Sequence, residues 1–520
     1  MSVTPGQDGI DTAEKDLPVM IVGAEAGSGS QLLTRRRLLK GAGGVAGLAA
    51  LGGGAYGAFR LVSGSGGTSA SPGRARVFVS RPDLRPPAVA VRGAISPAGY
   101  LLLGPKASGG SQPGALLLDG HGEPVWFKPL PSGLWATNVR VSRYRDRPVL
   151  TLWEGKVVSS TFGRGEGVIL DSSYREVARV RAGNGRQMDL HEFVLTPQGT
   201  ALFTCYPETV RADLSSVGGA SDGQAREAII QEVDVHSGRV LFEWRSLDHI
   251  PVTESYQSLA EPYDYLHANS IDVAPDGNLL VSARHTWALY KLDRRTGQVI
   301  WRLGGKRSDF RMESGSRFAW QHDARALSDR QITVFDTGAG PQQTESQSRG
   351  IVLEVDAAGK TVRLARSYRH PRPLLAEALG SVQMLPDGRV LVGWGSQPYA
   401  SEFAADGRLL ADVELGSGHR SYRAYRYRWT ARPTDAPALV TKRHHAKRAG
   451  MLYVSWNGAT EVSHWAVSAG SSAAALRPVG VAPRRGFETA IPLAAGDGYA
   501  RVTALDASGR RLAASAAVRL

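Results

Sequence analysis

Short apolar runs alternate with polar residues through most of the chain, and tight turns separate them. The sequence strand, Asp-Gly or Ser-Gly type of turn, strand recurs in the ranges 115–127, 193–204, 229–244, 270–283, 289–303, 351–365, 382–395 and 401–415. A period of two indicates half-buried strands, and a glycine in the turn supplies the positive φ of a hairpin. Long helical periodicity is nearly absent, so we expect an all-β protein.

The spacing of these hairpins predicts a β-propeller. Four-stranded units that recur every forty to fifty residues are typical of propeller blades, and about six such units fit between roughly residues 95 and 420. We therefore expect a six-bladed β-propeller over residues 73–430. A tandem of β-sandwiches would explain the alternation, but not the second strand pair and its tryptophan near the end at 229–244 and 289–303.

The character of the chain changes after residue 420. Residues 421–450 are basic, irregular and rich in turns, which predicts a linker or a strap along the propeller, with the linker itself at 431–450. Short alternating strands return over 451–520, and Trp456 stands early in one of them. This pattern indicates a small immunoglobulin-like or fibronectin-like β-sandwich module.

The N-terminal segment has the pattern of an export signal. Arg35 and Arg36 in TRRRLLK (34–40) precede a weakly apolar run at 41–59. This combination is typical of a twin-arginine export signal, so we expect residues 1–72 to be a leader and flexible linker recognised by the twin-arginine translocase. The protein is then extracytoplasmic, either secreted after cleavage near Ala70 or anchored in the membrane by residues 41–59.

Composition narrows the possible partners. The net charge is +14, but the arginines are scattered, with no lysine-rich stripe and no aromatic and basic RNA-binding signature. We expect no nucleic acid partner, whereas a basic excess would favour anionic substrates. Cys205 is the single cysteine, which excludes an intrachain disulfide and a cysteine-based metal site.

A set of polar residues recurs at the starts of apolar strands. His191 lies in DLHEF, His267 and Asn269 in YLHANS, and His322 in WQHDARAL, while Arg284 follows the hairpin that His267 opens. The innermost strands of a propeller line its central channel, and residues two apart on a strand face the same side. We therefore expect these five side chains to share one site.

This mixture of side chains suits an oxyanion better than a metal. Three histidines could bind zinc, but the arginine beside them opposes a cation and no H-E-x-x-H motif is present. The planar fork of Arg284 matches sulfate or phosphate, and a neutral imidazole can attack as a nucleophile or transfer protons near pH 7. We expect no metal and no cofactor.

Several sequence segments resemble those of the bacterial arylsulfotransferase family, whose members do not use phosphoadenosine phosphosulfate. They are DLHEFVLTPQGTALFT, LHANSIDVAPDGNLLVSAR, VIWRLGG and FAWQHDARAL, and LFEWRSLDHIP and LYVSWNGATEV are similar to the actinobacterial and fungal branch. The resemblance implies a six-bladed propeller and a ping-pong transfer of a sulfuryl group from a phenolic sulfate to a phenol.

The resemblance also implies roles for residues. His322 would be the nucleophile that becomes sulfohistidine, His191 or His267 would exchange protons with the phenols, and Arg284 and Asn269 would stabilise the charge on the sulfuryl oxygens.

Further residues would complete the site. For substrate binding we nominate Arg325 at a second sulfate edge and Trp320 and Tyr265, together with Trp287, beside the aromatic ring. Asp323 would orient His322 if it turned inward.

Two other functions stay open. One is a non-catalytic ligand-binding or scaffold propeller of the cell envelope. Such a protein would not need three histidines at strand starts and an arginine, so these residues discriminate against it. The other is a quinoprotein-like propeller enzyme, which would need a calcium-type acidic cluster that the sequence lacks.

Overall fold

A computed structural model describes residues 61, 63–65, 71–159, 161–444, 449–494 and 498–520. The predicted twin-arginine signal and the apolar run at 41–59 lie outside these residues. Chain contacts separate Met1–Ala55 from a second unit, Tyr56–Leu520, to which every element below belongs. Among the described residues no helix is long and apolar enough to cross a membrane.

The described part of the chain is built from antiparallel sheets, as predicted, and its helical turns are the short 3-10 segments η1 (Ser215–Val217), η2 (Ser246–Asp248) and η3 (Val252–Glu254). One sheet has the order β27-β3-β4-β5, so its first strand comes from far along the sequence. Its strands are β27 (Ser421–Tyr427), β3 (Tyr100–Pro105), β4 (Gly114–Leu118) and β5 (Pro124–Pro129).

The next sheet is eight-stranded, with the path β13-β12-β11-β10-β8-β7-β6 and β9 paired to β8. Two meanders of four strands, β6 to β9 and β10 to β13, merge in it where Met188 pairs with Gly165. The strands are β6 (Leu134–Tyr144), β7 (Arg147–Val157), β8 (Gly163–Leu170), β9 (Glu176–Val180), β10 (Met188–Leu195), β11 (Thr200–Ala212), β12 (Gly223–Asp234) and β13 (Val240–Arg245).

Three further sheets follow in sequence, with the orders β14-β15-β16-β17, β18-β22-β21-β20-β19 and β2-β26-β25-β24-β23. The first contains β14 (Ala268–Val273), β15 (Leu279–Ala283), β16 (Ala288–Leu292) and β17 (Val299–Gly304). The second contains β18 (Arg311–Met312), β19 (His322–Ser328), β20 (Gln331–Asp336), β21 (Arg349–Asp356) and β22 (Thr361–Tyr368). The third contains β2 (Ala90–Gly93), β23 (Ser381–Met384), β24 (Val390–Gly393), β25 (Tyr399–Phe403) and β26 (Leu409–Glu414).

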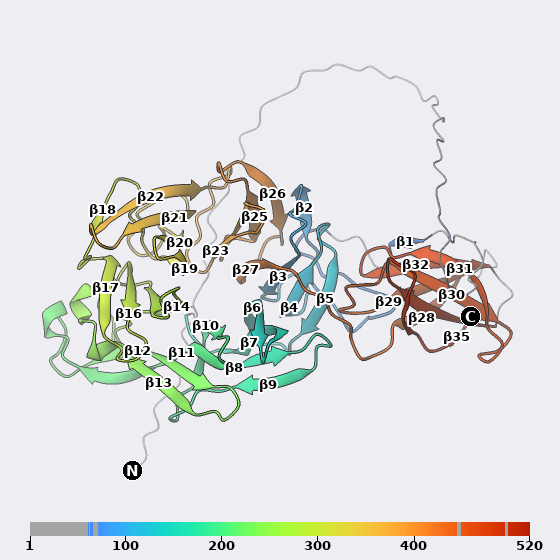
Figure 1. The fold of residues 1–520 in the computed structure, drawn as a ribbon, viewed down its shortest axis with the longest axis horizontal. Coiled ribbons are helices and arrows are strands. Elements are labelled where there is room, and N and C mark those ends of the chain that lie inside the picture. Colours follow the sequence, from blue (N-terminus) through green and yellow to red (C-terminus); the bar gives the residue numbers. More distant parts are fainter. Residues whose placement is uncertain (1–60, 62, 66–70, 160, 445–448, 495–497) are drawn as a thin grey trace, which may run out of the picture. The chain divides into compact units, whose positions relative to one another are not determined.

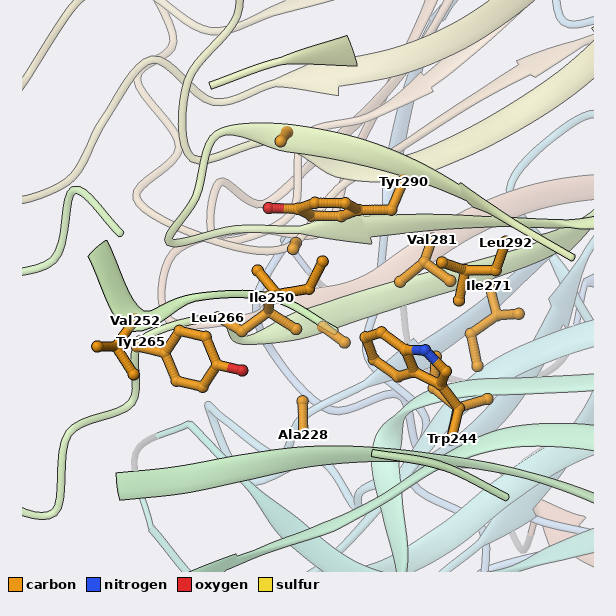
Figure 2. Packing of buried hydrophobic residues seen from close by; sticks show 14 of the residues in the cluster. Ala228, Trp244, Ile250, Val252, Tyr265, Leu266, Ile271, Val281, Tyr290 and Leu292 are labelled. Carbon is orange, nitrogen blue, oxygen red and sulfur yellow. The ribbon is translucent and has the colours of Figure 1, made fainter. Parts of the chain in front are cut away.

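The predicted hairpins are confirmed. Every turn of the Asp-Gly or Ser-Gly type quoted above joins two antiparallel strands, as in β14–β15, where Ile271 pairs with Val281. Apolar side chains of neighbouring sheets fill the space between them. Figure 2 shows one such cluster, in which Trp244 and Ile250 pack with Ile271 and Val281. Burying side chains of this size contributes about 1.5–3 kcal/mol each.

The first strands of the successive meanders form the centre of this arrangement. In order, β27, β6, β10, β14, β19 and β23 each contact the next, and β23 contacts β27. The remaining strands of each meander follow outward from these first strands (Figure 1). The arrangement is propeller-like, and it brings the first strands, which carry the predicted polar residues, to a common centre.

Residues 421–450 differ from the irregular segment that their sequence predicted. Strand β27 occupies 421–427 and pairs with β3, and β28 (Ala438–His444) pairs with β29 (Ala449–Ser455) inside the range 431–450. The basic residues of β27 led to the prediction of an irregular linker or strap. Arg423 and Arg426 are instead buried in ion pairs, with Glu192 and Glu402 respectively. A buried arginine with a carboxylate partner is compatible with an inner strand.

The C-terminal part consists of two sheets around one hydrophobic core, to which Leu452, Trp465 and Val502 belong. The first has the order β1-β32-β29-β28, and the second β31-β30-β33-β34 with β35 on β33. Their remaining strands are β1 (Gly64–Ser65), β30 (His464–Gly470), β31 (Arg477–Pro483), β32 (Glu488–Ala494), β33 (Tyr499–Leu505), β34 (Arg511–Ala514) and β35 (Val518–Arg519). Trp456 directly follows β29 instead of lying early in a strand, and its Nε1 donates to the carbonyl of Asp435 at 2.8 Å.

Candidate active site

A cavity of about 510 Å³ opens at one end of the central strands. Four of the five predicted catalytic side chains line it: His191, His267, Arg284 and His322. The volume lies within the range of small-molecule sites. The prediction that these residues share a site is therefore met for four residues on three sheets.

His191 stands in the middle of β10 and is 3 % exposed. A bulge between Met188 and Phe193 interrupts its pairing with β11, and its peptide N–H donates to Oδ2 of Asp189 at 3.2 Å instead. Its Nδ1 is hydrogen-bonded to the carboxylate of Asp189, whose other oxygen accepts the N–H of Gly163 at 2.8 Å. Because Nδ1 is engaged by the carboxylate, Nε2 is the nitrogen left to exchange a proton with a ligand.

His267 directly precedes β14 and has a φ of +57°. Its Nδ1 lies 2.7 Å from Oδ2 of Asp264, and its ring centroid lies 4.8 Å from that of His191. On the other side, the ring of His285 lies 4.7 Å away. Nδ1 of His285 donates to the carbonyl of Asp264 at 2.5 Å, while its Nε2 accepts from Arg284 at 3.0 Å. This arrangement fixes His285 as the neutral Nδ1–H tautomer.

Arg284 faces His267 across the end of the β14–β15 hairpin. Its peptide N–H donates to the carbonyl of His267 at 3.0 Å. The guanidinium donates to the Glu377 carbonyl at 3.1 Å and stacks on Trp320, whose ring centroid is 4.8 Å from Cζ. No carboxylate pairs with this guanidinium among the described residues, so its charge is available to an anion in the cavity.

His322 is the first residue of β19 and is 2 % exposed. Its Nδ1–H donates to the carbonyl of Trp320 at 3.1 Å, and its Nε2 accepts the peptide N–H of Leu379 at 3.2 Å. These two contacts define the tautomer, because a carbonyl can only accept and a peptide N–H can only donate. The lone pair of His322 is therefore on Nε2, beside Leu379, which also lines the cavity.

Burial and positive neighbours keep the imidazoles of His267, His285 and His322 neutral. Burial, followed by the charge of Arg284, holds the pKa of His322 well below its ordinary value, and burial, His191 and Arg284 do the same for His267. Burial also lowers the pKa of His285 to about 3, although Asp264 opposes the shift. Burial lowers the pKa of Arg284 to about 10, so it remains charged at neutral pH.

Three residues that the sequence did not single out also shape the cavity. Trp135 presents a nearly buried indole, and Lys106 and Arg420 add two cationic side chains to the wall. Glu377 is the one carboxylate among the described residues that line the cavity. The charges of the lining therefore favour an anionic ligand, as expected from the sequence.

The other predicted site residues lie away from the cavity lining. Asn269 is fully buried, donates from Nδ2 to the carbonyl of Gln321 at 2.7 Å, and accepts on its own carbonyl from Tyr422 at 3.1 Å. The prediction that Asn269 and His267 face the same side is wrong because the strand bulges between Ala268 and Ser270 and His267 adopts a left-handed φ.

The three aromatic residues predicted to flank the substrate ring also lie away from the cavity lining. Tyr265 belongs to the hydrophobic cluster of Figure 2, beside Val252 and Leu266. Trp320 is fully buried behind Arg284, and Trp287 stacks on Tyr256 with centroids 3.7 Å apart. None of these rings lines the cavity.

Arg325 belongs to an ionic network deep between the first strands. It contacts Glu192 at 2.6 Å and Asp323 at 2.7 Å, and Arg423 contacts the same two carboxylates at 2.8 and 3.1 Å. Asp323 therefore turns inward, but it pairs with arginines. The ring of His322 is oriented by the Trp320 carbonyl and the Leu379 N–H instead. Burial alone would raise the pKa of Glu192, but the guanidinium groups of Arg325, Arg423 and Arg140 lower it overall.

The donor atoms of Asp264, His267 and His285 lie within 4.8 Å of one another, a spacing that a metal ion could use. Both nitrogens of His285 are already engaged, and one of them faces the guanidinium of Arg284. These contacts suit a hydrogen-bonded cluster, and the absence of a metal stays a prediction.

A sequence profile of the arylsulfotransferase (ASST) family matches residues 140–416, more than half of the 520 residues. The match contains His191, His267, Arg284 and His322, and it ends before Arg420. No curated protein gives a significant sequence match to the chain.

Solved structures resemble the chain only distantly. A protein of unknown function from Bacteroides caccae is 14% identical, with 63% of this chain and 98% of that chain covered and a TM-score of 0.39. A periplasmic gluconolactonase from Pseudomonas aeruginosa is 13% identical, with coverage of 81% and 96% and a TM-score of 0.35. An inactive variant of virginiamycin B lyase from Staphylococcus aureus is 7% identical, with coverage of 71% and 97% and a TM-score of 0.33.

Proposed function

Because the chain belongs to the arylsulfotransferase (ASST) family, we propose that it moves a sulfuryl group from a phenolic sulfate ester to a phenol through a sulfohistidine on His322. One observation carries the proposal. A neutral, nearly buried imidazole and an arginine without a carboxylate partner among the described residues line the same cavity as His191 and His267. A nucleophile, an oxyanion-binding group and proton-exchanging groups are what sulfuryl transfer needs.

In the first half-reaction, the lone pair on Nε2 of His322 attacks sulfur. An N–S bond forms as the S–O bond to the aryl group breaks, and the electron pair leaves on the phenolate oxygen. The substrate must replace the peptide N–H of Leu379, which now occupies Nε2 at 3.2 Å. Positive charge that develops on the ring is stabilised by the Nδ1–H bond to the Trp320 carbonyl.

His191 is the residue that we assign to proton transfer. Its Nδ1 is held by the Asp189 carboxylate, which orients the ring. His191 gives its Nε2 proton to the departing phenolate. In the second half-reaction it takes a proton from the acceptor phenol as the phenol oxygen attacks sulfur and the N–S bond breaks.

His267 and Arg284 complete the site in this proposal. The planar guanidinium of Arg284 stabilises the charge spread over the sulfuryl oxygens. His267 stays neutral because burial, His191 and Arg284 lower its pKa, so its Nε2 can accept a hydrogen bond from the acceptor phenol. Asn269 acts indirectly, because its buried contacts with Gln321 and Tyr422 hold β14 against β19 and β27.

The test is trapping of the intermediate. The protein is mixed briefly with 4-nitrophenyl sulfate without an acceptor, quenched in alkali and analysed by intact-protein and peptide mass spectrometry. We expect one SO3 adduct on the His322 peptide, which phenol removes. His322→Asn should abolish the adduct, whereas His464→Asn, a change in the C-terminal sheets, should not.

Other outcomes are equally informative. An adduct on His191 or His267 would keep the reaction but move the nucleophile. Absence of both adduct and nitrophenol release with several donors would favour the alternative function, a non-catalytic ligand-binding propeller.

We also propose a finer architecture for this chain. Six blades would be formed by β27 with β3–β5, β6–β9, β10–β13, β14–β17, β19–β22 and β23–β26, and β27 would close the ring. The sheet orders and the contacts between first strands support this. The two C-terminal sheets would form the immunoglobulin-like or fibronectin-like sandwich, and the branch of the family would be the actinobacterial and fungal one.

Export by the twin-arginine route remains part of the proposal and rests on residues outside the described ones. Replacing Arg35 and Arg36 by lysine should retain the protein in the cytoplasm, as measured by cell fractionation. Extraction of membranes with alkaline carbonate would then separate a protein anchored by residues 41–59 from a secreted one.

A further inference from the structure

Two cations, Lys106 and Arg420, stand together on the cavity wall, away from the sheet that carries Arg284. Lys106 directly follows β3 and Arg420 directly precedes β27, and the two strands are paired. The peptide N–H of Lys106 donates to the carbonyl of Arg420 at 3.0 Å. The pairing of the two strands therefore places both side chains at one point of the lining.

The backbone on both sides of this pair is fixed by buried contacts. His419 is 1 % exposed, and its Nε2 lies 2.9 Å from Oγ of Ser111. Ser421 accepts the peptide N–H of Gly104 on its Oγ at 3.0 Å. Trp135, another lining residue, donates from Nε1 to the carbonyl of Gly104 at 2.8 Å. An aromatic face and two cations are therefore held in neighbouring positions by the same short segment.

Among the described residues no ion pair balances Lys106, which is half-buried, or Arg420, which is exposed. The strand pairing brings the two like charges together, and burial, followed by the charge of Arg420, lowers the pKa of Lys106. An anion between them would relieve this repulsion, and the indole of Trp135 would pack on a ring attached to that anion.

We propose that Lys106 and Arg420 form a second anion subsite in the cavity, so that the preferred aryl sulfates carry an additional negatively charged group such as a carboxylate. The inference rests on the proposed function, because it assumes that the sulfate ester lies at Arg284 and His322. The ring then spans the cavity, with its sulfate at one wall and its second charge at Lys106 and Arg420.

The experiment compares two donors that differ in one charge, 4-sulfooxybenzoate and its methyl ester. The ratio of their kcat/KM values is measured for the wild-type protein and for Arg420→Met, Lys106→Met and Arg408→Met. We expect Arg420→Met and Lys106→Met each to lower the ratio about tenfold, and Arg420→Lys to restore part of it. Arg408 is an exposed arginine in the β25–β26 turn, so its variant removes the same charge outside the cavity and should leave the ratio unchanged.

A second measurement does not depend on turnover. Calorimetric titration with 4-hydroxybenzoate and with its methyl ester should show binding of the carboxylate that weakens about tenfold in Arg420→Met. Turnover of both donors with the same ratio in all variants would overturn the subsite and leave the proposed function standing. Absence of turnover together with binding that depends on Arg420 would overturn the proposed function and leave the subsite standing.

Discussion

The proposed nucleophile should remain active at mildly acidic pH. His322 is 2 % exposed, and burial together with the charge of Arg284 holds its pKa well below the ordinary value of 6.5. An ordinary histidine with a pKa of about 6.5 would be unprotonated in only about a tenth of the molecules at pH 5.5. Because kcat/KM reports the groups of the free enzyme, that histidine would lose about tenfold between pH 7.5 and 5.5. For His322 we expect a change of less than about twofold.

The assay uses 4-nitrophenyl sulfate as donor and phenol as acceptor, with released nitrophenol measured after an alkaline quench. Nitrophenolate is a good leaving group, so the rate should depend little on a proton from His191. Arg284→Gln tests the cause: its rate should be lower at every pH, and an acidic limb should move toward pH 6.5 because one of the causes of the lowered pKa is gone. Arg408→Met should keep the wild-type profile. A tenfold loss in the wild-type protein with an apparent pKa near 6.5 would refute the reasoning.

Three further changes test other parts of the site. His191→Gln should lower kcat/KM about 10²–10⁴-fold for phenyl sulfate and much less for 4-nitrophenyl sulfate, because the poorer leaving group needs the proton; equal losses would argue against its role. Arg284→Lys should lower kcat about 10²–10³-fold, since a point charge replaces the planar fork. Steady-state kinetics measures this, and an unchanged kcat would argue against the role of Arg284. Glu192→Gln should destabilise the protein by about 3–5 kcal/mol by leaving buried arginines unbalanced, and denaturant unfolding would measure it against Arg408→Met.

Local signals were enough to predict the fold class and the hairpins. Alternation and turn glycines act within about ten residues, so each quoted hairpin could be found without knowledge of its neighbours. The pairing of β27 with β3 joins residues more than three hundred positions apart, and no local signal marks it. The same long-range pairing hides Lys106 and Arg420 from sequence analysis, since only the pairing of β27 with β3 makes them neighbours.

The candidate site was predicted where it depends on strand order and missed where it depends on backbone detail. His191 and His322 lie on first strands and His267 directly precedes one, and all three reach one cavity, as the recurrence of their positions indicated. Asn269 was misplaced because a bulge, which leaves little trace in the sequence, breaks the period of two. Asp189 and Asp264 stand two and three residues before a predicted histidine, a spacing that could have nominated them as hydrogen-bond partners.

The position of the ionic network gives a physical reason why two of the cavity histidines, His191 and His322, are each followed by an acid. His191 is followed by Glu192 and His322 by Asp323, and in both pairs the histidine lines the cavity while the acid joins the buried arginines. Adjacent residues on a strand point in opposite directions, so one strand can deliver a reactive group outward and an anchoring charge inward. The buried ion pairs then fix the strand positions on which these two imidazoles stand. It follows that loss of Glu192 should impair sulfuryl transfer as well as stability, although Glu192 touches no substrate.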